Sequence, residues 1–559
     1  MRSSREVAFR LRQELKNVYL WKRPPRIEIA ENLAPAFSAP SAVVSPGEIV
    51  HLAAGIRRHQ FPIFGQILDT GPQISWRRDY QRGIETGLQY FRTIPYLDCD
   101  RAGDHKFIWE LNRHQHLVTL AQAYLIDGDV ANLAEIQTQL ESWSVHNPFQ
   151  QGINWASALE VAMRAMSWMW VYHFVGPKLP VEFRRGWLRE LYLHAFHIEN
   201  NPSFYFSPNT HLLGEALALH QLGMFFRGQA RAPRWESLGE KIMRDQMDRQ
   251  VHADGSHFEQ SSYYHVYALD MFLLHAALTK PDPAYMDRLE RMTEYLHALL
   301  GPAGSLPFLG DDDGGRLFHP YGPRDQFGRA TRARASIVLN RKDWPAASRL
   351  FPNAGIAVMV SGDNQVLVDA GGFGPWGAGH SHADCLSIVA RAGAEEILID
   401  PGTYTYVADA HWRDWFRSTA AHNTIRIDGI DQAVAAGPFR WRNHPEVRIL
   451  SWTTDASGDA LEAECRYAGF VHRRRVEFQK PDLVSITDHV DGPPGQHLLE
   501  QFWHLGSPAA RDRLTLAEGA ELLDSWRSTV FGEKHPSPLA CVTRRGVLPM
   551  RLEARINLS

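Results

Sequence analysis

The spacing of apolar residues changes along the chain, and this change constrains the fold more than any other feature. Between about 105 and 300, apolar residues recur every three to four positions, as in the runs 158–170 and 212–222. Short breaks rich in Pro, Gly or Asp separate these runs, for example at 147–148 and 281–283. The pattern predicts stacked helical hairpins.

After about residue 350 the apolar residues instead form short alternating or continuous runs rich in β-branched side chains. The predicted strands are 356–360, 365–369, 386–390, 397–400, 448–452, 476–479 and 483–488. Turn residues at near-regular intervals between them favour an antiparallel sandwich or layered sheet. The boundary is expected between Gly310 and Pro352, and the first 100 residues are expected to form an irregular segment packed against the helices.

Composition excludes some function classes. A net charge of −4 and a pI near 6.7 argue against nucleic-acid binding, so a polyanionic ligand would need cations placed locally. The 17 Trp, 17 Tyr and 27 Phe include enough rings for some to line a groove. Four cysteines without a CxxC pair, at 99, 385, 465 and 541, are expected to be buried free thiols.

The N-terminal residues lack the apolar core of a secretory signal, and no run of about 18 apolar residues occurs in the chain. We therefore expect a soluble, cytoplasmic protein with no membrane insertion. The sequence carries no information on its oligomeric state.

A cluster of metal-ligand residue types follows the boundary. His380 and His382 are two positions apart, so on a strand they would share a face. Asp400 closes an apolar run and His422 precedes another. Two His and one carboxylate suit a divalent ion such as zinc, with a fourth base nearby for chemistry. The alternative is a satisfied hydrogen-bond cluster within a β-sandwich.

The helical half holds a first polar cluster at 207–215. Pro208 indicates a helix start, and Asn209 or Thr210 is the expected N-cap. Asn209 could then be only a cap and His211 only a packing residue. In the functional interpretation, both face a cleft and Glu215, one turn away, orients the His211 ring.

A second polar and aromatic cluster spans 254–265, at the mouth of a predicted helix. Within it Tyr264 is either structural or, acting with His380, a proton-transfer group. The acidic run 311–315 lacks the ligand spacing of an EF-hand loop and is predicted to be a capped turn. The basic run 472–475 is predicted to be a solvated strand face that could help to hold an acidic polymer.

As a set, these motifs resemble the heparinase II/III family of polysaccharide lyases. The matching segments are 109–116, 152–155, 209–215, 254–265, 379–384, 399–404 and 416–424. The resemblance implies an incomplete (α/α) toroid over 101–330, with the segment 1–100 packed on it, and antiparallel β-sheets over 350–559. It also implies cleavage of a uronic-acid polysaccharide by β-elimination.

The resemblance further implies roles for individual residues. Asn209 would hold the uronate carboxylate and His211 would assist, while Tyr264 and His380 would supply the base and the acid in an order set by the substrate epimer. The implied metal ligands, for a structural zinc near the active site, are His382, Asp400 and His422. The implied substrate contacts are Asn154, Trp155, Glu215, His265 and Arg417.

The polymer is not specified by these motifs. Heparan sulfate-like glycosaminoglycans are the first expectation, followed by hyaluronan, alginate or a bacterial exopolysaccharide, and the family resemblance leaves a periplasmic or secreted location open. A glycoside hydrolase would need two carboxylates, for which Glu215, Glu259 and Asp311 are candidates. A non-catalytic glycan-binding protein on the same scaffold is the third alternative.

Overall fold

The computed structural model describes residues 3–29, 46–318 and 321–559. The chain forms two compact units. Unit 1 comprises Met1–Gln246 and Gly315–Tyr321, and unit 2 comprises Met247–Gly314 and Gly322–Ser559.

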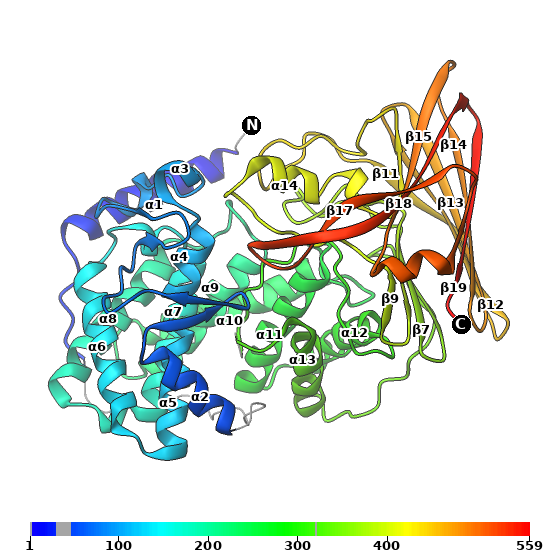
Figure 1. Cartoon of the computed structure of the whole chain (residues 1–559). Helices are drawn as coiled ribbons and strands as arrows, with labels where there is room; N and C mark the ends of the chain where they lie inside the picture. Colours follow the sequence, from blue (N-terminus) through cyan, green and yellow to red (C-terminus); the bar gives the residue numbers. More distant parts are fainter. Residues whose placement is uncertain (1–2, 30–45, 319–320) are drawn as a thin grey trace. The chain divides into compact units, whose positions relative to one another are not determined.

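Unit 1 is mostly helical (Figure 1). Its helices are α1 (Ser4–Lys22), α2 (Pro46–Ile56), α3 (Cys99–Ala102), α4 (His105–Asn112), α5 (Gln115–Asp127), α6 (Val130–His146), α7 (Ala158–Val175), α8 (Val181–Asn200), α9 (Thr210–Phe225) and α10 (Ala232–Gln250), the last of which ends in unit 2. Two small hairpins accompany them, β1 (Gln60–Ile63) with β2 (Gln66–Asp69) and β3 (Arg78–Asp79) with β4 (Ile84–Glu85).

Helix α7 forms the core of unit 1. It packs against α5, α8 and α9, and every residue from Ala158 to Tyr172 is buried. A helix that is buried on all sides lies in the interior, surrounded by other elements. His114 adopts a φ of 57° and separates α4 from α5.

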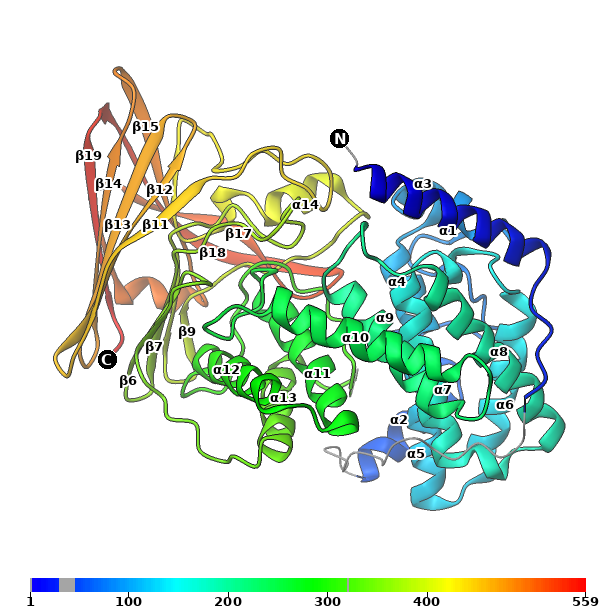
Figure 2. The same ribbon diagram turned by 180° about the vertical axis from the view of Figure 1, so that it is seen from behind.

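Unit 2 combines four helices with three antiparallel sheets. The helices are α11 (Ser262–Thr279), α12 (Pro283–Leu300), α13 (Arg324–Val338) and α14 (Ala410–Phe416). The five-stranded sheet contains β5 (Arg349–Phe351), β6 (Ile356–Ser361), β7 (Asn364–Asp369), β8 (Ser387–Ala392) and β9 (Glu395–Leu398), in that order. Helix α11 packs against α12 and α13, as Figure 2 shows.

The other two sheets complete the unit. The six-stranded sheet has the order β11 (Glu446–Thr454), β12 (Gly458–Tyr467), β13 (Phe470–Gln479), β14 (Leu483–Asp491), β19 (Met550–Asn557) and β16 (Leu514–Leu516). The four-stranded sheet has the order β10 (Ile425–Ile427), β15 (Gln496–His504), β18 (Glu533–Val547) and β17 (Ala520–Val530). One apolar core contains residues from all three sheets.

A buried ion pair lies inside this core. Arg474 donates to both carboxylate oxygens of Asp488 at 2.7 and 2.8 Å, and Gln501 of the four-stranded sheet donates to the same carboxylate. His472 binds it as well. The prediction of a solvated face for 472–475 is therefore wrong for these two residues, because strand alternation turns His472 and Arg474 inward and leaves Arg473 exposed.

The change from helix to strand falls between α13 and β5, inside the expected boundary. The domain limits 101–330 and 350–559 stay a prediction. The two compact units do not follow these limits, because unit 2 contains α11 to α13 together with the sheets. The sequence predicts an irregular segment over the first 100 residues. The structure describes these residues except for 1–2 and 30–45, and they contain the long helix α1.

All four cysteines are buried and free, as predicted. None of the described helices is long and apolar enough to cross a bilayer.

We expect Asp488→Asn to destabilise unit 2 by about 3–5 kcal/mol, because Arg474 would keep its charge in the core without a counter-charge. Arg474 and His472 outweigh the opposing effect of burial and hold the pKa of Asp488 well below its usual value. The wild-type contribution is therefore complete above the ordinary carboxyl pKa and is lost as the pH falls below it.

Urea unfolding with hydrogen exchange of β13 and β14 measures this effect at neutral and acidic pH. Arg473→Gln, on the exposed face of the same strand, is the matched control and should change stability by less than about 0.5 kcal/mol. Equal effects of the two variants would contradict the role given to the buried pair.

Candidate functional site

Tyr264 and His380 form a stacked pair in unit 2. Their ring centroids are 3.9 Å apart with an interplanar angle of 23°. Tyr264 lies in the first turn of α11, where the N-cap Ser261 accepts its backbone N–H. His380 lies in the turn segment between β7 and β8. Two segments far apart in sequence thus place an aromatic hydroxyl beside an imidazole.

The hydroxyl of Tyr264 has two polar partners. It donates to Asp313 Oδ2 at 3.1 Å and lies 3.0 Å from the hydroxyl of Tyr406. Burial raises the pKa of Tyr264 well above its ordinary value, and the negative charge of Asp313 raises it further. The hydroxyl is therefore protonated at neutral pH and is connected to a second tyrosine and a carboxylate.

Both ring nitrogens of His380 face carboxylates. Nδ1 lies 3.0 Å from Asp311 Oδ2, and Nε2 lies 3.3 Å from Glu259 Oε2. Burial disfavours the charged ring, but the hydrogen bond to Asp311 and the charges of Glu259 and Asp311 outweigh it and raise the pKa of His380. The imidazole is thus oriented on both sides, and its side chain keeps 11% exposure.

Asp311 connects this pair to a second histidine and an arginine. Its Oδ1 lies 2.9 Å from His382 Nε2, and Arg413 of α14 donates to both oxygens at 2.5 and 2.8 Å. Burial opposes ionisation, but Arg413 and the two histidines hold the pKa of Asp311 well below its usual value. Glycine at position 310 allows the backbone beside Asp311 to lie close to that of His380, because a Cβ at Gly310 would lie 2.7 Å from the His380 carbonyl oxygen.

A buried group that could hold a metal adjoins Asp311. One ligand atom from each of His382, Asp384, Asp400 and His422 can be chosen so that all four lie within 4.8 Å of one another. His422 Nδ1 is 2.8 Å from Asp400. His382 Nδ1 and His422 Nε2 are buried and have no hydrogen-bond partner among the described residues. Two unsatisfied imidazole nitrogens beside two carboxylates fit the donor set of a divalent cation.

The local structure differs from the expectation in two respects. Residues 380–384 form turns and irregular backbone, so His380 and His382 do not share a strand face. They instead bind the two oxygens of Asp311, which is the centre of the site rather than part of a simple capped turn. Asp312 does form the turn, because its Oδ1 accepts Gly314 N–H.

Sequence reasoning assigned no role in this site to Asp313, Asp384, Tyr406 and Arg413, and it named Asp311 only as a candidate carboxylate of the hydrolase alternative. The sequence did contain an indication that Asp384 belongs to the site, since it stands two residues after His382 in the His-x-His-x-Asp segment. The sequence contained no such indication for Arg413, because its role depends on α14 packing beside a loop about one hundred residues away in sequence.

Asn209 and His211 lie in unit 1. Asn209 is the N-cap of α9, and its side-chain oxygen accepts the His211 N–H at 3.1 Å. His211 is half-buried, and its ring centroid is 6.5 Å from that of Phe206. The capping interpretation of Asn209 is thus confirmed, while the catalytic roles of both residues stay predictions.

The five residues predicted to contact the substrate are all buried and have hydrogen-bond partners within the chain, and their contact with substrate stays a prediction. Asn154 and Trp155 are fully buried and bind Asn147. Both carboxylate oxygens of Glu215 bind Ser203 and not the His211 ring.

The two remaining contacts lie in unit 2. His265 donates its Nε2–H to the Met292 carbonyl oxygen at 2.9 Å. Arg417 is fully buried, binds Asp414 and the Gly437 carbonyl, and stacks on Trp441. Neither side chain is accessible to a polymer in this conformation.

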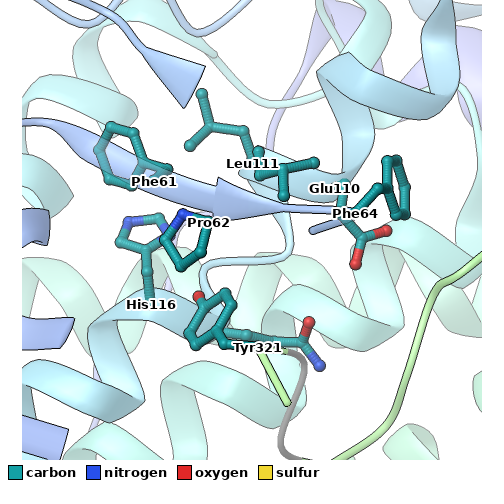
Figure 3. Close-up of a pocket in the computed structure, with 9 residues that line it drawn as sticks. Phe61, Pro62, Phe64, Glu110, Leu111, His116 and Tyr321 are labelled. Carbon is teal, nitrogen blue, oxygen red and sulfur yellow. The ribbon is translucent and has the colours of Figure 1, made fainter. Parts of the chain in front are cut away.

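Unit 1 also contains a small pocket (Figure 3). Its lining residues are Phe61, Pro62, Ile63, Phe64, Glu110, Leu111, Gln115, His116 and Tyr321. None of the predicted site residues lines it.

The chain combines a helical part with antiparallel sheets, and unit 2 holds a histidine-rich centre. This combination defines a class of proteins in which a helical toroid is followed by β-sheets. The chain belongs to the heparinase II/III family: residues 24–316 match the profile of the heparinase II/III N-terminus, and residues 344–543 match that of the heparinase II/III-like C-terminal region.

Two curated relatives are named heparin-sulfate lyase. The protein from Bacteroides stercoris is 24% identical over 437 residues, and that from Pedobacter heparinus is 24% identical over 414 residues. Each alignment covers 70% of this chain, and they cover 62% and 61% of the respective relatives. The matched region therefore spans about three fifths of each relative.

Solved structures confirm the predicted fold. A crystal structure of heparinase III matches with a TM-score of 0.71 at 16% identity, over 98% of this chain and 90% of that one. A mutant of the heparan sulfate lyase HepC from Pedobacter heparinus matches with a TM-score of 0.59 at 20% identity, over 98% and 88%. An incomplete (α/α) toroid followed by antiparallel sheets is thus the fold class of this chain.

We expect Arg413→Met to destabilise unit 2 by about 3–5 kcal/mol, because the Asp311 carboxylate would lose its strongest counter-charge while staying buried. Urea unfolding measures the loss. Arg440→Met, at an exposed position of the same unit, removes the same charge and should change stability by less than about 0.5 kcal/mol. A loss below 1 kcal/mol for Arg413→Met would show that the histidines alone satisfy Asp311.

Proposed function

We propose that this chain is a polysaccharide lyase that cleaves a uronic-acid-containing polymer by β-elimination, with heparan sulfate-like glycosaminoglycans as the first candidate substrates. The observation that carries the proposal is the stacked Tyr264–His380 pair, which places two proton-transfer groups side by side. The names of the curated relatives support the substrate class.

In this reaction a base removes the C5 proton of the uronate, the electron pair forms the C4–C5 double bond, and the C4–O bond breaks. An acid then protonates the leaving oxygen. Tyr264 and His380 are the proposed acid and base. For a syn elimination Tyr264 can serve both steps, whereas an anti elimination needs the two groups on opposite faces of the sugar.

The C5 proton becomes acidic only when the neighbouring carboxylate is neutralised. Asn209, with His211 assisting, is proposed for this role on the family pattern. The Asp311–Arg413 pair is proposed to hold His380 in place, since Asp311 binds its Nδ1 and is itself held at both oxygens.

A hydrolase mechanism fits the geometry less well. It needs two carboxylates beside the scissile bond, with one of them protonated. Asp311 is fully buried and is bound by two histidines and Arg413. Glu259 faces His380, and Glu215 binds Ser203. Each candidate carboxylate therefore has a structural partner.

The proposed ligands of a structural zinc are His382, Asp400 and His422, with Asp384 as a fourth. Imidazole nitrogens and carboxylate oxygens are both ligand types that zinc takes, and four of them complete a tetrahedral set. When bound, the ion would fix the segments that carry these residues. His382 would ligate through Nδ1, while its Nε2 keeps the contact to Asp311 and so orients the ring.

We expect the wild-type chain to release products that absorb in the ultraviolet when it is incubated with a panel of heparan sulfate, hyaluronan, alginate and exopolysaccharides. Tyr264→Phe should lower kcat/KM by about 10²–10⁴-fold, the usual contribution of a general acid–base group, and His380→Ala should do the same. Tyr295→Phe is the matched control, since Tyr295 is similarly buried but packs on His265 and Phe351.

Product mass separates the reaction classes, because hydrolysis adds one water and elimination adds none. Wild-type activity in both Tyr264→Phe and His380→Ala would refute the residue assignment. A saturated, hydrated product would refute the elimination itself.

We expect the purified chain to hold about one divalent ion, measured by elemental analysis after dialysis. His422→Ala should lose the ion and lower the thermal midpoint, because the metal stabilises the folded state that it binds. His380→Ala should retain it, since His380 faces Asp311 and Glu259 instead. Loss of the ion in both variants would show that His380 is itself needed for binding.

A further inference from the structure

A second feature of unit 2 is a lysine held among aromatic rings. Lys534 Nζ lies 4.2 Å from the ring centroids of both Trp412 and Trp526, and 5.4 Å from that of Tyr404. We call these four residues the aromatic–lysine cluster. All four side chains are half-buried, so each keeps part of its surface in solvent. The cluster contains none of the residues discussed above.

The lysine has no anionic partner. Its ammonium group contacts three rings, and no carboxylate among the described residues forms an ion pair or hydrogen bond with it. Asp409, the acidic residue that acts on Tyr404, uses its carboxylate to cap α14 at the Trp412 N–H. The cation therefore has three donors available for an external acceptor.

Three elements and one loop supply the residues of the cluster. Trp412 lies on α14 and Trp526 on β17, whereas Lys534 lies at the start of β18. The segment carrying Tyr404 is tied to the β17–β18 hairpin by two hydrogen bonds, from Ser528 N to Pro401 O and from Gly532 N to Tyr404 O, both 2.7 Å long.

Glycine at 402 is required for this attachment. Its φ is 86°, and a Cβ there would lie 2.1 Å from the Ser528 carbonyl oxygen. Ser528 falls at the irregularity in the β17–β18 pairing, between Arg527 and Val530. The close contact of loop and hairpin thus positions the Tyr404 ring beside the lysine.

The cluster shares its elements with the Tyr264–His380 centre. On α14, Trp412 belongs to the cluster and the next residue, Arg413, binds Asp311. Two residues after Tyr404, the hydroxyl of Tyr406 lies 3.0 Å from that of Tyr264. The two sites are therefore neighbours within unit 2.

We propose that the aromatic–lysine cluster is a subsite for one acidic sugar residue, next to the residue that reacts at the Tyr264–His380 centre. Aromatic faces pack on the C–H faces of a pyranose ring, while an ammonium group binds a carboxylate or sulfate. The chain is acidic overall, with a net charge of −4, so a cation without a counter-ion is a specific means of holding a polyanion. The proposal rests on the proposed function for the identity of the polymer and for the sugar residue that reacts at the Tyr264–His380 centre.

Binding without turnover tests this subsite. In a Tyr264→Phe background, calorimetry with a heparan sulfate octasaccharide should show a Kd about tenfold to hundredfold higher after Lys534→Met, the effect of losing one charged hydrogen-bond donor. Lys534→Arg should retain tight binding. Lys241→Met, which removes an exposed and already paired lysine of unit 1, should leave Kd unchanged.

Thermal unfolding separates a ligand role from a packing role. The subsite predicts that Lys534→Met leaves the midpoint within 2 °C of the parent, roughly the shift of a neutral surface change, while Kd rises. A lower midpoint with unchanged Kd would overturn the subsite and leave the cluster as a cation–π support for the hairpin. In the active chain, the subsite predicts a higher KM with unchanged kcat.

The outcome is independent of the elimination reaction. If no polymer yields an unsaturated product, the proposed function fails, yet a Lys534-dependent Kd for the octasaccharide would still support the subsite. If elimination is observed but Lys534→Met has the parental Kd and KM, the subsite fails and the proposed function stands.

Discussion

The centre of this protein depends on one buried carboxylate, that of Asp311. A charge with no solvent exposure is stable only when other groups compensate for the lost hydration. Here Arg413 supplies the counter-charge at both oxygens, while His380 and His382 complete the contacts. Because these partners come from two separate segments, the single charge holds both segments in place.

Through its two histidine contacts, Asp311 connects the group that could hold a metal to the Tyr264–His380 pair. His382 presents Nε2 to Asp311 and Nδ1 to the group that could hold a metal, whereas His380 presents Nδ1 to Asp311 and its ring face to Tyr264. A carboxylate that binds the second nitrogen of a metal-binding histidine is a common way of fixing its tautomer and orientation. Here the same carboxylate orients the neighbouring histidine as well.

The distribution of cations bears on how an acidic chain could hold the acidic polymer that we propose as its substrate. Arg413, Arg417 and Arg474 are buried and neutralised by internal carboxylates, so they offer nothing to a ligand. Lys534 is placed differently, because rings rather than carboxylates surround it. Local placement, and not net charge, therefore decides where an anionic sugar can bind.

The sequence by itself determined the class of fold and the residue types of the centre. Apolar spacing separates helices from strands because side-chain direction follows the period of each element, and the His-x-His segment with Asp400 and His422 indicated a metal group from ligand chemistry alone. Only the tertiary structure decided which groups meet. Asp311, Tyr406 and Arg413 join the centre through contacts between distant segments, and Asn154, Trp155 and Arg417 are buried among partners within the chain. Local periodicity reports the face on which a residue lies, whereas its partners depend on how remote elements pack.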